Sequence, residues 1–183
     1  MCRTHWLFFV LLLSFGQVGA PVAAQQRRPV VDTIAVHFPL PGADCALFPA
    51  KAALPPWNPT APLPTKRFTP SRGQVRAVEK ALQGLSLERV NERPETGYYA
   101  GYAALIKQHL PDYQRQYFGF YSPQGHRCFF INFFIERLDE PAGYVPRWLR
   151  TPMITHDGGS AYWSIFYDLT TRTFYQFEHN VEG

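Results

Sequence analysis

His156, Asp157 and Ser160 bring the three residue types of a hydrolytic triad within five positions of one another. A triad is a geometry in which one imidazole bridges a hydroxyl and a carboxylate, and neighbours in a turn rarely reach it. Gly158 and Gly159 fall inside the same segment and indicate a turn, since only glycine adopts positive φ without strain. The segment therefore predicts a turn before a strand, with Asp157 bonded to its own backbone.

Residues that bind metals occur at His126, at His156 and at the adjacent pair Glu178 and His179. Adjacent residues on a strand point to opposite faces, so Glu178 and His179 are not expected to reach the same ion. The spacing also lacks the closely set ligands of a zinc site. We expect no metal and no cofactor.

Aromatic residues are unusually abundant, at 16% of the chain. Residues 115–120 resemble in part an aromatic strand that stacks RNA bases, but their glycine spacing differs from that module. A net charge of +4 is also too small for a nucleic-acid surface, so no nucleic-acid partner is expected. So many rings do not all fit inside a small core, which predicts an exposed binding patch. The candidates for this patch are Tyr117, Tyr121, Trp148, Phe166 and Phe174.

Two cysteines, Cys45 and Cys128, remain if an N-terminal signal containing Cys2 is removed. In an oxidising compartment they could form a disulfide that stabilises the fold by roughly 4 kcal/mol. The alternative is that Cys128 is a buried small hydrophobic residue on a strand while Cys45 lies in a loop that never meets it. The sequence leaves both possibilities open.

Two helices are predicted ahead of the strands. Ser71 and Gln74 fit a capping box at the start of a helix whose apolar residues recur at helical spacing up to Gly84. A second helical segment is predicted over residues 98–109, and Pro111 prevents its continuation.

Strands are predicted over residues 115–121, 126–136, 160–169 and 173–179, with a type I turn at residues 122–125. In the second strand, Phe129, Ile131 and Phe133 alternate with Cys128, Phe130, Asn132 and Phe134, which predicts that both faces are covered. These elements predict an α+β fold in which two N-terminal helices pack on one face of a four-stranded antiparallel up-and-down sheet.

The N-terminus has the three parts of a secretory signal peptide: Arg3, an apolar run that ends near Phe15, and small residues up to Ala24. The alternative, a membrane anchor, requires about 20 strongly apolar residues, and the run here is shorter. We therefore expect cleavage after Ala24 and no stable membrane span. The predicted organisation is a signal peptide over residues 1–24, a proline-rich arm over 25–69 and an α+β domain over 70–183.

Several segments resemble a family of small exported proteins of unknown function that is common in Bacteroidota. They are residues 115–120, 130–134, 156–160 and the closing hairpin at 169–177. The resemblance covers residues 71–183 and implies an envelope protein. It assigns no catalytic residue.

Together these features predict an exported, non-enzymatic binding module, located in the periplasm or outside the cell. Its expected partner is an envelope protein, a peptide or a glycan. The alternative is a small hydrolase of an unrecognised type that uses polar residues near Asp157, among them His156, His126 and Glu178. A concave pocket that gathers several of these residues would favour the hydrolase.

Overall fold

The computed structural model describes residues 34–55, 63–92, 96–135 and 141–181. The predicted signal peptide, residues 1–24, lies outside these ranges. Within them, none of the helices is both long and apolar enough to span a bilayer.

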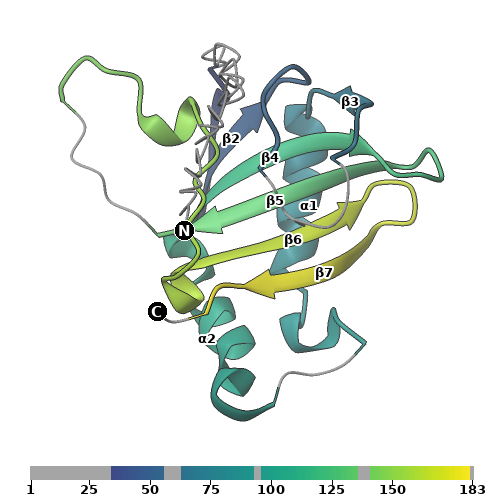
Figure 1. Cartoon of the computed structure of the whole chain (residues 1–183), viewed down its shortest axis with the longest axis vertical. Coiled ribbons are helices and arrows are strands. Elements are labelled where there is room, and N and C mark those ends of the chain that lie inside the picture. The colour runs from purple at the N-terminus through teal and green to yellow at the C-terminus, as the bar shows by residue number, and fades with distance from the viewer. Residues whose placement is uncertain (1–33, 56–62, 93–95, 136–140, 182–183) are drawn as a thin grey trace, which may run out of the picture. The chain divides into compact units, whose positions relative to one another are not determined.

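The domain is built on a seven-stranded mixed sheet (Figure 1). Six strands follow the order β1-β2-β4-β5-β6-β7, and β3 pairs with β4 beside this path. The pairing of β2 with β4 is parallel, and every other pairing is antiparallel. The strands are β1 (Val36–Leu40), β2 (Ala43–Phe48), β3 (Arg67–Phe68), β4 (Gln114–Tyr121), β5 (Arg127–Phe134), β6 (Tyr162–Asp168) and β7 (Thr173–His179).

The predicted fold class was therefore wrong. The sheet has seven strands rather than four, is mixed rather than antiparallel, and begins before the helices, the first of which starts at residue 72. The three missed strands lie in the proline-rich segment, so its described residues are part of the sheet. Pro39 is tolerated because β1 is an edge strand, where a missing amide interrupts no central ladder. Pro41 and Gly42, with φ of 71° at the glycine, form the tight turn into β2.

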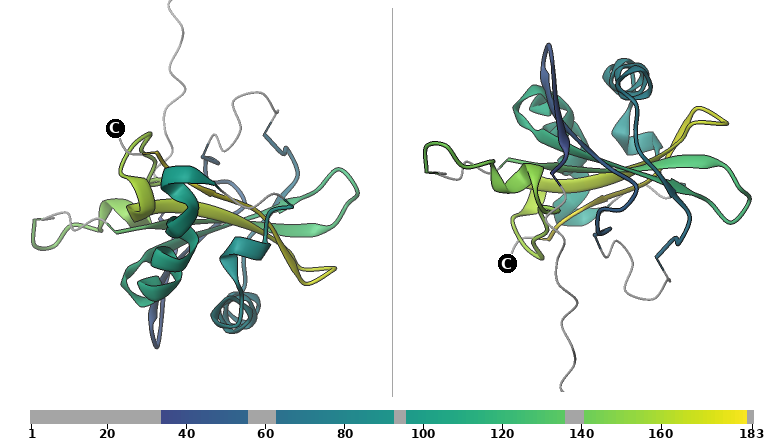
Figure 2. Two further views of the ribbon diagram at one scale, coloured as in Figure 1. Left: turned by 90° about the horizontal axis from the view of Figure 1, so that it is seen from below. Right: turned by 90° about the horizontal axis from the view of Figure 1, so that it is seen from above.

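Two α-helices cover one side of the sheet, as Figure 2 shows. The capping box predicted at the start of α1 (Arg72–Gln83) is confirmed: Ser71 Oγ accepts from the Gln74 amide, and the Gln74 side chain accepts from the Ser71 amide. Helix α2 (Tyr102–Gln108) starts later than predicted because residues 97–101 form a 3₁₀ turn. Gly97 opens that turn at a φ of 73°.

The alternation predicted for the second strand is confirmed, because its two sets of side chains enter two separate clusters. Phe129, Ile131 and Phe133 of β5 pack on the helix side, with buried residues of α1 and α2. Cys128, Phe130 and Phe134 pack on the opposite side, beneath Ala52, Trp148, Leu149 and Met153 from the loops. The sheet is thus buried on both faces, and the second one is covered by loops and a short 3₁₀ helix, Arg147–Leu149, rather than by an α-helix.

Candidate functional site

A cavity of about 480 Å³ lies at the end of the sheet that carries the β4–β5 and β6–β7 turns, and we call it the turn-end cavity. Its apolar walls include Pro64, Phe120 and Phe166, and the last two belong to the loop-covered side of the sheet. Polar side chains from both turns complete it. Its volume lies within the range of about 300–1,000 Å³ that is typical of small-ligand sites.

A histidine–aspartate pair joins the two turns at this cavity. His126 Nδ1 lies 2.7 Å from Asp168 Oδ2, and the side chains of His126 and Asp168 are 38% and 13% exposed. Asp168 Oδ1 accepts the backbone amides of Thr170 at 2.7 Å and Thr171 at 3.1 Å. Burial opposes ionisation, but the bonds from His126 and the two amides outweigh it and hold the pKa of Asp168 below its ordinary value.

This arrangement fixes the tautomer of the imidazole. An ionised carboxylate only accepts hydrogen bonds, so Nδ1 of His126 carries the proton that is donated to Asp168. The neutral ring then keeps Nε2 as an acceptor, while Asp168 already accepts three hydrogen bonds from its own chain. The pair therefore presents a hydrogen-bonding nitrogen rather than a free negative charge.

Cys128 and Tyr175 form a second, uncharged pair at the same cavity. The thiol donates to the carbonyl oxygen of His126 at 3.7 Å. Burial raises the pKa of the Cys128 thiol, and burial together with the contact to Cys128 raises the pKa of Tyr175. Both groups are therefore neutral at physiological pH, so Cys128 is not an activated thiolate.

A bulge in β7 adds Gln176 to the cavity. The register of β6 with β7 shifts between Ser164 and Phe166, and Gln176 adopts a φ of 49°. On a regular strand Tyr175 and Gln176 would point to opposite faces, but here both line the cavity. A non-glycine residue at positive φ is uncommon, and such strain clusters at functional sites.

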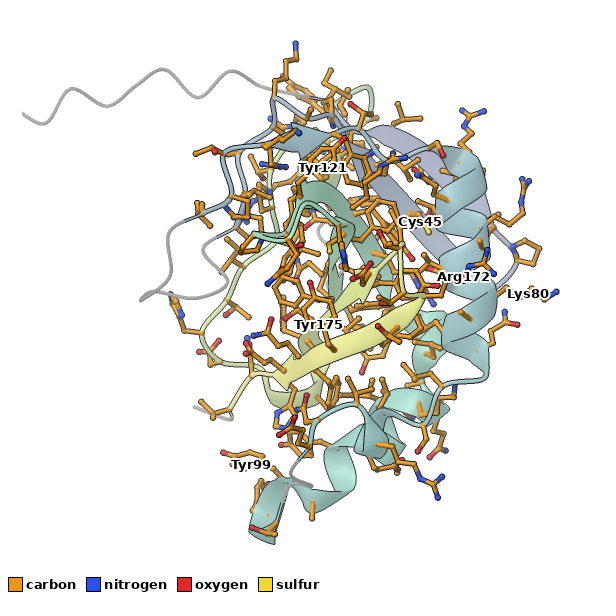
Figure 3. All side chains as sticks on the ribbon, turned by 90° about the vertical axis from the view of Figure 1, so that its right-hand side faces the viewer. Cys45, Lys80, Tyr99, Tyr121, Arg172 and Tyr175 are labelled. Atoms are coloured by element: carbon orange, nitrogen blue, oxygen red, sulfur yellow. The ribbon has the colours of Figure 1, made fainter. Side chains whose placement is uncertain are left out.

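Aromatic rings form a row across this face. Phe166 stacks on Tyr175 with centroids 5.3 Å apart, and Phe120 meets Phe166 edge-on at 5.8 Å. Phe120 and Phe166 are buried, so Tyr175, which is half-buried, offers the most ring surface. Figure 3 looks onto the turn end and shows Tyr175 on the side of β7 away from α1.

A smaller cavity of about 170 Å³ gathers His156, Glu178 and His179, and we call it the Glu178 cavity. Burial raises the pKa of Glu178. Asp157 does not line this cavity: its carboxylate accepts from the hydroxyl of Thr155 at 2.7 Å. The described residues hold no group of three His, Cys, Asp or Glu side chains suited to a metal ion. The volume is also well below that of typical ligand sites.

The five aromatic residues expected in an exposed patch do not form one. Tyr117, Trp148 and Phe166 are buried, while Tyr121 and Phe174 are half-buried. The reason is that cores on both faces of the sheet absorb the rings. Phe166 alone among the five lines the turn-end cavity.

Tyr117 instead belongs to a polar network buried between the sheet and α1. Its hydroxyl donates to Glu79 Oε1 at 2.6 Å, and Arg115 Nε lies 2.9 Å from the same oxygen. Cys45 Sγ also donates to this oxygen, at 3.7 Å. Burial raises the pKa of Glu79, against the opposing effects of Arg115 and Tyr117. The network ties α1 to β2 and β4.

The two cysteines are both free. Cys45 lies on β2 in the helix-side cluster, whereas Cys128 lies on β5 in the loop-side cluster. The sheet therefore separates the two thiols, and of the two possibilities left by the sequence the structure has the one without a disulfide. Cys45 differs from that expectation in being a strand residue rather than a loop residue.

His126 was among the candidate residues predicted from the sequence. Asp168, Tyr175 and Gln176, which line the same cavity, were not. Comparison of the chain with family models, curated proteins and solved structures gave no match. The fold and the cavity therefore define the class that can be stated: a domain of helices on a seven-stranded mixed sheet, with a ligand-sized cavity at the turn end.

Proposed function

We propose that this chain is an exported binding module and that its ligand occupies the turn-end cavity. The observation that carries the proposal is the convergence of two turns and a β-bulge on one cavity of about 480 Å³. A few placed polar groups among apolar walls are typical of ligand sites. The N-terminal pattern of basic start, apolar run and small residues supports export to the periplasm or beyond.

The ligand comes from the cell envelope: a glycan, a peptide or a segment of an envelope protein. Burial keeps the Cys128 thiol and the Tyr175 hydroxyl neutral, and Ser122 Oγ at the same cavity accepts the backbone amide of His126 at 3.2 Å. Binding without chemistry is the simplest use of such a site. The Glu178 cavity gathers His156 and Glu178, which favours the hydrolase alternative. That alternative still has less support, because this cavity is small and the Asp157 carboxylate is bonded to Thr155 outside it.

Hydrogen–deuterium exchange on the purified chain tests this proposal. The chain is measured alone and with glycan, peptide and protein fractions of an envelope extract. We expect at least one fraction to slow exchange at residues 122–126 and 173–176 together. Protection centred elsewhere, for example on the 73% exposed Tyr98, or no protection by any fraction, would refute the proposal.

A further inference from the structure

The charges around the turn-end cavity restrict what it can bind. Among the described residues that line it there is no lysine or arginine, and Asp168 is the sole carboxylate. Cations from the neighbouring strands are engaged elsewhere: Lys66 Nζ lies 4.6 Å from the Tyr121 ring and Arg127 Cζ lies 4.3 Å from the Phe68 ring. An anionic ligand would find no lysine or arginine here, and the ring of His126 is already bonded to the Asp168 carboxylate.

A cationic ligand is disfavoured for a different reason. Asp168 already accepts three hydrogen bonds from its own chain, one from His126 and two from turn amides. A cationic group that approached the carboxylate would compete with the contact between His126 and Asp168 that joins the two turns. Cys128 and Tyr175 add no charge. The cavity is thus suited to a neutral ligand.

The polar groups that remain are ones that pair with hydroxyls. Gln124 and Gln176 are exposed amides, each of which both donates and accepts hydrogen bonds. His126 Nε2 accepts in the neutral ring and donates in the protonated one. A hydroxyl satisfies either state of this nitrogen, whereas a group with only acceptors or only donors satisfies one.

The apolar groups offer flat surfaces beside these polar ones. The half-buried ring of Tyr175 stands next to Gln176, and Pro64 and Pro123 line the same cavity. Aromatic faces carry negative partial charge and attract the polarised C–H groups of a bound ring. A ligand with apolar faces and hydroxyls at its edges matches both sets of groups.

The shape of β7 argues against an extended peptide. β7 is an edge strand, and a peptide would bind it by adding a strand to the sheet. The bulge and the positive φ of Gln176 interrupt the regular row of amides and carbonyls that such pairing requires. The same bulge supplies a side chain to the cavity, so it favours a compact ligand over a strand.

We propose that the turn-end cavity binds a neutral saccharide of about one or two rings, held against Tyr175 and hydrogen-bonded by Gln176 and His126. This inference rests on the proposed binding function and names its ligand class. Gln176 is a specificity-determining residue in it, placed in the cavity by the bulge.

The test is a ¹H–¹⁵N NMR titration of the purified chain with defined probes. They are neutral mono- and disaccharides, a uronic acid of matched size, and a short uncharged peptide. We expect saturable shifts at residues 122–126 and 173–176 with at least one neutral sugar. We expect the uronic acid to bind at least about tenfold more weakly, because no lysine or arginine lines the cavity to meet its carboxylate.

Two variants of one hairpin make a matched pair. Gln176 and Arg172 both adopt positive φ, at 49° and 60°, but only Gln176 lines the cavity. Arg172, labelled in Figure 3, belongs to the turn between β6 and β7, whereas Gln176 lies at the bulge within β7. Glycine accepts this backbone conformation, so neither Gln176→Gly nor Arg172→Gly should lower the melting temperature. We expect Gln176→Gly to weaken sugar binding about tenfold or more and Arg172→Gly to change it by less than about twofold.

The possible results distinguish a failure of the saccharide proposal from a failure of the proposed binding function. Tighter binding of the peptide or the uronic acid than of any sugar would overturn the saccharide and leave the cavity as a binding site. Equal effects of the two glycine variants would overturn the role of Gln176. If no probe shifts the cavity, the saccharide fails, and the exchange experiment decides independently whether the cavity binds anything.

Discussion

Gly119 of β4 pairs with Phe68 of β3, and adding one methyl group there should loosen β3. A Cβ on Gly119 would lie 2.4 Å from the Phe68 carbonyl oxygen and 2.9 Å from two atoms of the Phe68 ring. Real Cβ atoms essentially never come within 3.0 Å of a neighbour, so the strands must separate by at least 0.6 Å. The atom in the way is backbone, which cannot rotate aside as a side chain can.

The energetic cost of moving β3 away from β4 depends on how the Phe68 side chain packs. Its ring is buried between Tyr121, at 5.5 Å, and Phe129, at 5.6 Å, with Arg127 on its face. Overpacking of this kind costs about 1–3 kcal/mol. For Gly119→Ala we therefore expect a loss of about 2 kcal/mol in unfolding free energy and a fall of about 4–8 °C in melting temperature.

Urea denaturation followed by circular dichroism measures this effect, and Gly73→Ala is the control. Gly73 lies in α1 with nothing within 4 Å of an added Cβ, so alanine there should stabilise the protein by about 0.4–1 kcal/mol. The same chemical change thus has opposite signs at the two positions. A Gly119→Ala protein within about 0.5 kcal/mol of wild type would refute the close packing of β3 on β4.

Three further predictions concern the buried groups and the helix start. Because burial raises the pKa of Glu79 above its ordinary value of 4.5, the folded state binds this proton more tightly than the unfolded state, so Glu79 contributes most stability below pH 4.5 and progressively less as the pH rises. Glu79→Gln should flatten that part of the pH profile in denaturant titrations, and an unchanged slope would contradict the assignment. Ser71→Ala removes half of the capping box and should cost about 1 kcal/mol in the same assay, whereas no loss would mean that the cap is unimportant. Cys45 and Cys128 should react slowly with iodoacetamide in the folded protein and completely in denaturant, and thiols still unreactive after unfolding would reveal a disulfide.

The features predicted correctly from the sequence are those that depend on residues close together in the chain. The Ser71 capping box depends on residues three positions apart, and it was predicted at the correct residues. The two faces of β5 follow from strict alternation along one strand, so the pattern alone separated Phe129 from Phe130. The turn at residues 122–125 is closed by a hydrogen bond from the Gly125 amide to the Ser122 carbonyl, again a local contact.

The strands β1 and β2 were not predicted, because they lie in a segment rich in proline. Residues 25–69 were predicted to form a proline-rich arm outside the domain, but Pro39 lies on an edge strand and Pro41 in a turn, where neither interrupts the hydrogen bonds of the sheet. The sequence shows that a proline has no backbone amide to donate. Only the order of the strands in the sheet shows whether a neighbouring strand required a hydrogen bond from that amide.

The candidate site depended on the tertiary structure for the same reason. His126 and Asp168 are 42 positions apart, and they meet because β5 pairs with β6 in one particular register. The bulge that turns Gln176 into the cavity is a mismatch between two strands, which neither strand encodes alone. The sequence by itself determined the alternation, the cap and the abundance of aromatic rings. The fold decided that those rings fill two cores and that the polar groups left over gather at the turns, because pairing across the sheet is a long-range choice.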